Sequence, residues 1–301
     1  MVAAAQINGL SIDIEEWFQV GAFEQVIRRD QWEGLASRVE ESTLLALDLF
    51  AAAGVRGTFF TLGWVARRHP ALIRRIVDAG HELASHGWDH ARVFTLEPAS
   101  FAADLARARA VLEDLGGVAV TGYRAPSFSI DTRTPWAHQV LAEAGYAYSS
   151  SVAPLAHDHY GWRAAPRFAW RPLADSGLIE LPVTTVAVAG RRMAAGGGGF
   201  FRVLPYSFTH WAINHVNVAE GRPALTYFHP WELDPGQPRV DGAPLRSRLR
   251  HYTNLEGMAG KLRRLLGDFA WGRMDELVAR EAPHARFIDL AGTAAPGSLA
   301  A

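Results

Sequence analysis

Between residues 7 and 150, short apolar runs rich in β-branched and aromatic side chains alternate with longer segments of helical periodicity. This alternation is typical of βα units, because parallel strands need a crossover connection, usually a helix, between them. The pattern predicts strands at residues 10–14, 55–62, 81–85, 118–123, 146–150, 178–183 and 224–229. It predicts helices at residues 41–53, 70–79 and 98–115, each closed by a glycine. We therefore expect an α/β protein with a parallel sheet that lies open or closes into a barrel.

The chain length of 301 residues allows either one large α/β barrel or two ordinary domains. After Pro230 the composition changes to a segment rich in turn residues, and an amphipathic helix near residues 255–266 follows it. We expect residues 1–235 to form the α/β unit and residues 236–301 to form a C-terminal extension packed on it.

The ionisable composition excludes several classes of function. The chain has 30 Lys and Arg against 31 Asp and Glu, so no overall field attracts nucleic acid or an anionic membrane surface. The absence of cysteine excludes disulfides, thiolate metal sites and cysteine nucleophiles. Any metal must therefore bind histidine and carboxylate ligands.

The start of the chain lacks the basic residues and the long apolar stretch of a secretory signal. No apolar run reaches transmembrane length. The sequence therefore predicts a cytoplasmic protein without a transmembrane segment, and it makes no prediction of an oligomeric state.

Two histidines four residues apart, His86 and His90, form the strongest local signal for a metal site. Where the segment is helical, this spacing places both imidazoles on one face, a common way to hold a metal through neutral nitrogen ligands. An isolated pair of this kind is more often a coincidence on a surface turn. The interpretation therefore depends on neighbouring residues.

Three carboxylates, Asp13, Glu15 and Glu16, stand at the end of the first predicted strand. Alone they could simply precede a helix N-terminus, where carboxylates are favoured. Asp13 and Glu15 share one face of the strand, so both can point into one site. Two histidines and one carboxylate with open positions form a hydrolytic zinc-type centre, in which the ion lowers the pKa of water to about 7 and polarises a carbonyl.

Two further polar residues follow predicted strands. Arg124 offers a guanidinium that can orient a carboxylate through paired hydrogen bonds, although a lone arginine more often forms a surface salt bridge. His229 is followed by Pro230 and Trp231, and a lone histidine there is usually only a polar strand terminus.

Taken in order, these segments resemble the motifs of the polysaccharide deacetylase family of NodB homology over about residues 7–232. The matching residues are Asp13 and Glu15 for its first motif, His86 and His90 for its second, Arg124, Pro126 and Phe128 for its third, and Leu225 and His229 for its last. The Asp-x-Glu-Glu-Trp-Phe start, the glycines at 196–199, the segment 229–232 and the segment 250–252 look like the exosortase-associated branch found in bacterial exopolysaccharide loci.

The resemblance implies a distorted (β/α) barrel of about seven strands. It implies a metal-dependent hydrolase that removes N-acetyl groups from an amino-sugar polysaccharide in exopolysaccharide biosynthesis, with Zn²⁺ as the expected cofactor. The implied roles are metal ligands Glu15, His86 and His90, base Asp13, its partner Arg124, acid His229, and substrate contacts Trp88, Pro126, Phe128 and Trp231. The commonest family pattern has two adjacent aspartates, which leaves Glu16 as a rival to Glu15 for the metal.

Other interpretations stay open. The same site could hydrolyse a small linear or cyclic amide, in which case a lidded pocket would replace an open groove. The chain could instead be a non-catalytic carbohydrate-binding module, whose structural metal would have a closed coordination shell. The glycines at 196–199 predict a loop rather than a phosphate cradle, and residues 157–159 (His-Asp-His) predict a solvated loop rather than a second metal site.

Overall fold

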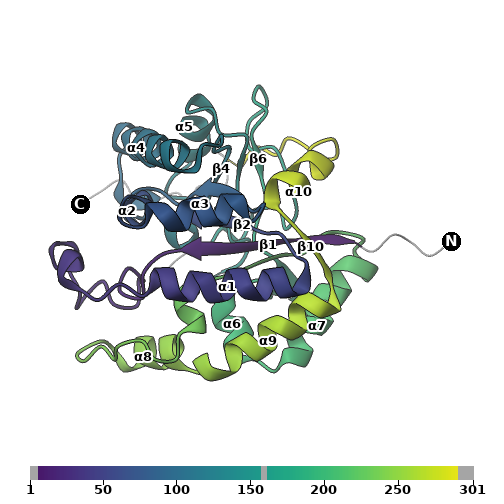
Figure 1. The fold of residues 1–301 in the computed structure, drawn as a ribbon. Coiled ribbons are helices and arrows are strands. Elements are labelled where there is room, and N and C mark those ends of the chain that lie inside the picture. Colours follow the sequence, from purple (N-terminus) through teal and green to yellow (C-terminus); the bar gives the residue numbers. More distant parts are fainter. Residues whose placement is uncertain (1–5, 157–160, 291–301) are drawn as a thin grey trace.

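A curled, mostly parallel sheet forms the centre of the computed structural model, which describes residues 6–156 and 161–290 (Figure 1). Its strand order is β10-β1-β2-β3-β4-β5-β6, and β9 also pairs with β1. The strands are β1 (Ile7–Ile14), β2 (Thr58–Thr61), β3 (Glu82–Ser85), β4 (Gly122–Tyr123), β5 (Tyr148–Ser149), β6 (Ile179–Glu180), β9 (Leu225–Phe228) and β10 (Ala270–Gly272). The predicted distorted (β/α) barrel is confirmed. Residues 157–159 lie outside the described residues.

Irregular segments bridge the space between β6 and β9. The amide of Thr184 donates to the carbonyl of Leu225 (3.3 Å), and the amide of Tyr227 donates to the carbonyl of Gly196 (2.8 Å). The barrel is therefore distorted because loop backbone, in place of a strand pair, completes this wall.

Helices follow most of the strands and cover the outside of the sheet (Figure 1). They are α1 (Val39–Ala53), α2 (Gly63–Arg68), α3 (Pro70–Asp78), α4 (Pro98–Gly116), α5 (Ala137–Glu143), α6 (Gly198–Val203), α7 (Tyr206–Asn214), α8 (Leu245–Tyr252), α9 (Leu255–Asp268) and α10 (Met274–Glu281). The strands β7 (Thr185–Val188) and β8 (Arg191–Ala194) form a separate antiparallel hairpin. Within the described ranges, no helix is long and apolar enough to span a membrane.

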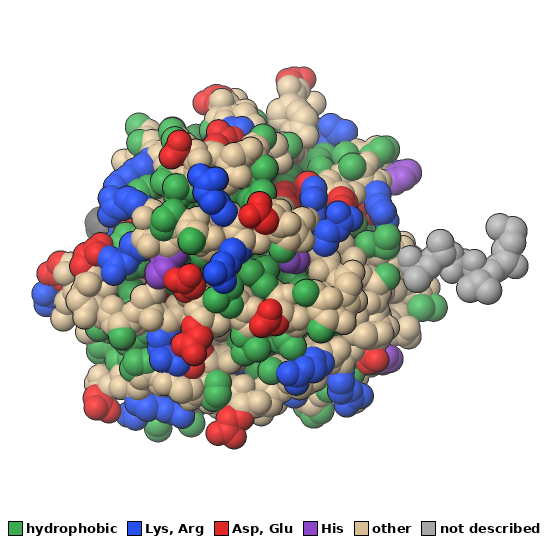
Figure 2. All heavy atoms as spheres, in the orientation of Figure 1, with side chains coloured by type: hydrophobic (Ala, Val, Ile, Leu, Met, Phe, Trp, Pro, Cys, Tyr) green, Lys and Arg blue, Asp and Glu red, His purple; other side chains and the backbone are tan. Residues whose placement is uncertain are grey.

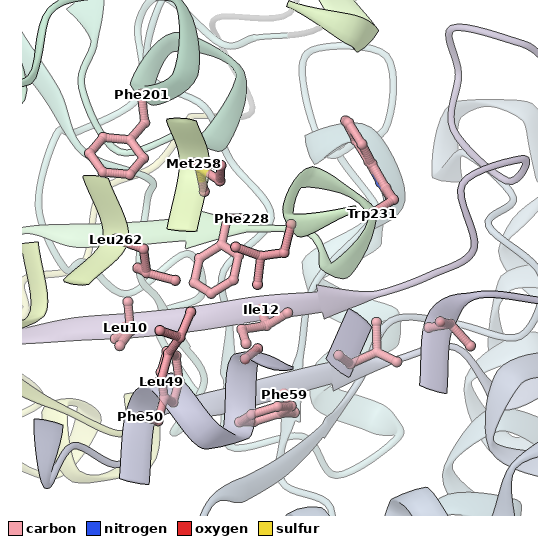
Figure 3. Packing of buried hydrophobic residues seen from close by; sticks show 14 of the residues in the cluster. Leu10, Ile12, Leu49, Phe50, Phe59, Phe201, Phe228, Trp231, Met258 and Leu262 are labelled. Atoms are coloured by element: carbon pink, nitrogen blue, oxygen red, sulfur yellow. The ribbon is translucent and has the colours of Figure 1, made fainter. Parts of the chain in front are cut away.

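The period-2 pattern of β1 separates two faces. Leu10 and Ile12 are fully buried and pack in one cluster with side chains of α1 and α9, as Figure 3 shows. Full burial of such a side chain contributes about 1.5–3 kcal/mol, so this layer fixes the position of β1. Ser11 and Asp13 point to the opposite face, where the side chain of Arg124 reaches both of them.

Residues after 235 take part in the central sheet. The strand β10 pairs in parallel with β1 at Ile7, Asn8 and Gly9. Helix α9 adds Met258 and Leu262 to the core that faces β1 (Figure 3). The domain boundary at residue 235 stays a prediction.

Candidate active site

Glu15, His86 and His90 lie together at the C-terminal ends of β1 and β3. One ligand atom from each of the three lies within 4.8 Å of the other two. Oε2 of Glu15 is 2.8 Å from Nε2 of His90 and 3.9 Å from Nε2 of His86. One carboxylate and two imidazoles, all with little exposure to solvent, therefore form a possible three-ligand metal site.

The ring of His86 is fixed by the neighbouring strand. Its Nδ1 is 2.8 Å from the carbonyl oxygen of Arg124, so Nδ1–H donates there and the Nε2 lone pair faces Glu15. Burial lowers the pKa of His86 to about 4, which keeps the ring neutral. A neutral imidazole with a free nitrogen is the form that binds a metal.

The segment from His86 to His90 is not helical, so helical spacing is not what brings the two rings together. Gly87 has φ +78° and His90 has φ +61°, and these turns fold the segment back. The amide of Trp88 donates to the carboxylate of Asp104 (3.1 Å), which lies beneath the turn. Tight turns anchored by Asp104 thus hold the ring centroids of His86 and His90 5.5 Å apart.

Glu15, not Glu16, lies beside the two histidines. Burial alone would raise the pKa of Glu15, but His90 and His229 outweigh it and hold the pKa well below its usual range. Glu16 points away and accepts hydrogen bonds from the amide of Arg38 (3.0 Å) and the hydroxyl of Ser37, at the start of α1. Glu16 therefore ties the first loop to α1.

Asp13 is held by a buried guanidinium. Arg124 donates from one nitrogen to Oδ1 of Asp13 (2.7 Å) and to Oγ of Ser11 (2.8 Å). It also donates to Oγ of Ser150 (3.0 Å) and to the carbonyl of Ser150 (3.1 Å). Charge-assisted bonds of this kind fix the direction of a carboxylate, and Oδ2 of Asp13 faces Nε2 of His229 at 4.0 Å.

His229 stands between two sets of carboxylates. Its Nε2 is 3.7 Å from Glu15, while its Nδ1 is 3.3 Å from Oε1 of Glu232. Burial lowers the pKa of His229, but the charges of Glu15, Glu232 and Asp13 outweigh burial and raise it to about 9. The ring is therefore a proton carrier whose Nε2 faces the site.

No role was predicted from the sequence for Glu232 or for the residues packed behind it. Glu232 is 1% exposed, and Nε of Arg202 lies 3.5 Å from its Oε1. Arg202 is equally buried and donates to the carbonyls of His251 (3.0 Å) and Thr253 (2.6 Å). The detectable signal was the spacing of Glu232 three residues after His229, because a 3-10 turn aligns side chains three residues apart.

Trp231 has both ring faces covered. His229 stacks on one face (5.0 Å between centroids) and His251 on the other (4.2 Å). The indole N–H donates to Oε1 of Glu15 (3.1 Å). Trp231 thus positions Glu15 and His229, and its faces are not free to stack on a sugar.

The other predicted substrate contacts are also buried. The guanidinium of Arg107 lies 3.5 Å from the ring centroid of Trp88. Phe128 and Pro126 belong to the turn after β4, and the ring of Phe128 meets Tyr227 edge to face at 4.8 Å. These residues shape the walls around Asp13 and Arg124, and their role in substrate binding stays a prediction.

Two family models match this chain, one in its first half and one in its second half. Residues 33–149 match the family described as polysaccharide deacetylase. Residues 150–279 match a domain of unknown function (DUF3473). The first range contains His86, His90 and Arg124, whereas His229 and Glu232 lie in the second.

Two relatives and one structure are similar to the chain. A chitooligosaccharide deacetylase of Bradyrhizobium sp. (strain ANU 289) is 31% identical over 129 residues, which are 43% of this chain and 53% of the relative. A peptidoglycan deacetylase of Helicobacter pylori is 29% identical over 106 residues, 35% of each chain. The crystal structure of a Mycobacterium smegmatis protein assigned as a polysaccharide deacetylase covers 100% of this chain and 96% of its own, with a TM-score of 0.59 and 19% identity. The last comparison shows a shared fold over the whole length.

Proposed function

We propose that this chain, which belongs to the polysaccharide deacetylase family, is a metal-dependent hydrolase that removes N-acetyl groups from an amino-sugar polysaccharide or its oligosaccharide precursor. One observation carries the proposal. Asp13, held by Arg124, and His229, backed by Glu232, lie 4.0 Å apart (Oδ2 to Nε2) beside the cluster of Glu15, His86 and His90. A base, an acid and a metal-binding group therefore converge at one end of the sheet.

The residues present fit a divalent ion. Glu15, His86 and His90 offer one carboxylate and two imidazole nitrogens, the donor set that zinc accepts. Hydrogen bonds from Trp231 to Glu15 and from His86 to the backbone orient two of the three ligands. A bound zinc ion would polarise the acetyl carbonyl and lower the pKa of a water molecule.

The chain's own residues would carry the proton transfers. Asp13 takes a proton from the attacking water, and the water oxygen bonds to the acetyl carbon. The carbon–nitrogen bond then breaks as Nε2 of His229 gives its proton to the departing amine. A positioned acid or base typically contributes about 10² to 10⁴-fold each.

The substrate class rests on the named activities of the relatives. Chitooligosaccharides and peptidoglycan both carry N-acetylated amino sugars, which supports a glycan of this kind here. A role in bacterial exopolysaccharide synthesis, and the cytoplasmic location, stay predictions from the sequence.

Metal analysis of the purified protein, followed by acetate release from a panel of N-acetylated glycans and small amides, tests the proposal. His86→Ala and His90→Ala should lose metal and activity together, because both rings are ligands. His210→Ala, on an exposed histidine of α7, is the matched control and should keep both. Full metal occupancy in the first two variants would refute the ligand assignment.

The same panel separates the alternatives. Turnover of a small linear or cyclic amide without release from any glycan would favour the amide hydrolase. Glycan binding with bound metal and no acetate release would favour a carbohydrate-binding module.

A further inference from the structure

Helix α8 has one face directed to the active site and another directed to solvent. Its buried residue His251 stacks on Trp231. On the solvent side, Leu245 is 69% exposed and Leu249 is 59% exposed. Because these leucines are four residues apart, they form one apolar stripe along the helix.

The neighbouring helix α6 also exposes apolar side chains. Phe200 and Val203 of α6 are 42% and 53% exposed. Arg202 lies between them in sequence and joins α6 to α8 through hydrogen bonds to the carbonyls of Arg250 and His251. We define the α6–α8 surface by seven residues, all exposed except the half-buried Arg248: Phe200, Val203, Leu245, Leu249, Arg246, Arg248 and Arg250.

The arginines of the α6–α8 surface have no carboxylate partners. Among the described residues, no salt bridge or hydrogen bond is made by the guanidinium groups of Arg246, Arg248 and Arg250. Some other surface arginines do have carboxylate partners, as in the pairs of Arg28 with Asp30 and of Arg92 with Glu24. Three unpaired guanidinium groups on one short helix leave their charge available to a partner outside the chain.

Positive charge gathers in this part of the sequence although the chain as a whole is nearly neutral. Residues 236–264 contain basic side chains at Arg239, Arg246, Arg248, Arg250, Lys261, Arg263 and Arg264, and acidic side chains only at Asp241 and Glu256. Figure 2 shows Lys and Arg side chains beside hydrophobic ones and a few acidic ones along the lower edge, where Figure 1 places α8. Salt screens charges beyond about 8–10 Å, so a large partner at this edge meets the local excess and not the formal net charge of −1.

We propose that the α6–α8 surface binds an anionic lipid bilayer. A leucine stripe with Arg246 and Arg250 aligned beside it is what an interfacial helix presents, with apolar side chains in the headgroup region and guanidinium groups against phosphates. A soluble polyanion would use the arginines but not Leu245, Leu249, Phe200 and Val203. The inference rests on this surface and not on the proposed function. Bilayer binding through this surface would place the active site close to the membrane, because only one stacked pair of aromatic rings separates the site from α8.

Vesicle co-sedimentation with the full chain tests this proposal. We expect binding to vesicles of phosphatidylcholine with phosphatidylglycerol at about 0.1 M salt and loss of binding at about 1 M salt. The double variant Arg246→Gln with Arg250→Gln should bind about tenfold or more weakly, and Leu245→Ser with Leu249→Ser should also weaken binding. The matched controls are Arg74→Gln with Arg75→Gln on α3, and Val218→Ser at a position 75% exposed.

Four outcomes would overturn the proposal. The first is binding to the anionic vesicles that is no stronger than binding to phosphatidylcholine alone. The second and third are equal binding by the arginine variant and its control, and binding by the leucine variant that equals the wild type. The fourth is a leucine-dependent dimer in light scattering without vesicle binding. Because the substituted side chains are exposed and none contacts the site, all variants should keep the wild-type melting temperature and activity on a soluble N-acetylated oligosaccharide. This control separates failure of the membrane proposal from failure of the proposed enzyme activity.

Discussion

Oε1 of Glu232 lies 3.3 Å from Nδ1 of His229, on the side of the imidazole away from the metal-binding group. This contact orients the ring so that Nε2 faces Asp13 and Glu15. Because the carboxylate is buried, its charge acts on His229 with little screening by water.

Glu232→Gln should keep the metal and lower kcat at least tenfold, because the amide removes the charge that raises the pKa of His229. An acid with a lower pKa loses its proton at lower pH, so the alkaline limb of the kcat profile should move to lower pH. Profiles of kcat against pH, with metal content measured alongside, check this. An unmoved alkaline limb would mean that Glu232 supports the fold alone.

The three carboxylates at the C-terminal end of β1 should respond differently to amide substitution. Asp13→Asn should retain metal and lose about 10² to 10⁴-fold in rate, as expected for removal of a general base. Glu15→Gln should bind metal more weakly, with activity partly restored by excess ion. Glu16→Gln is the control and should mainly affect stability, since Glu16 contacts Ser37 and Arg38. Loss of metal in Glu16→Gln but not in Glu15→Gln would reverse the assignment.

Two adjacent glycines offer a steric test of the acid side of the site. A Cβ on Gly198 would lie 1.9 Å from Oε2 of Glu232, whereas a Cβ on Gly199 meets nothing within 4 Å. Gly198→Ala should therefore displace Glu232 and lower kcat without removing metal. Gly199→Ala should leave kcat unchanged and add about 0.5–1 kcal/mol of stability, because it reduces the entropy lost on forming α6. Equal kcat values for the two variants would argue against the contact.

Glu82 should make the fold less stable as pH rises. Burial, followed by the charge of Asp275, raises the pKa of Glu82 from 4.5 to about 7. Its contribution is fully present below about pH 4.5 and is lost as pH rises through about 7. We expect the free energy of unfolding in urea to lose about 1–3 kcal/mol between pH 5 and pH 8 from this group. Glu82→Gln should flatten that part of the profile, and parallel profiles for the two proteins would contradict the assignment.

The sequence predicted most of the sheet because β1, β2 and β3 are clear apolar runs followed by helices. It overestimated β4, where only Gly122 and Tyr123 pair, because α4 continues to Gly116 and the chain then turns. It missed β10, since Ala270–Gly272 is too short to show a period. Short strands are defined by their partners and not by their own residues.

The candidate site was predictable where both partners belong to recognisable patterns, as with Asp13 and His86. The residues packed behind the candidate catalytic side chains were not predictable from the sequence. Arg202, Glu232 and His251 come from three segments whose approach depends on the folded backbone, and only Glu232, three residues after His229, carries a local signal.

The pairing of β1 with β9 and β10 ties the first strand of the chain to residues 225–228 and 270–272. A chain emerging from the ribosome therefore cannot complete the hydrogen bonding of β1 until residue 272 has been synthesised. Contacts of such long sequence separation slow folding and leave strand edges exposed in the meantime. A fragment that stops at residue 149, where the two family matches meet, would keep both histidines yet leave β1 without these two neighbours. The two matched regions are thus better regarded as one cooperative folding unit than as modules that can be exchanged.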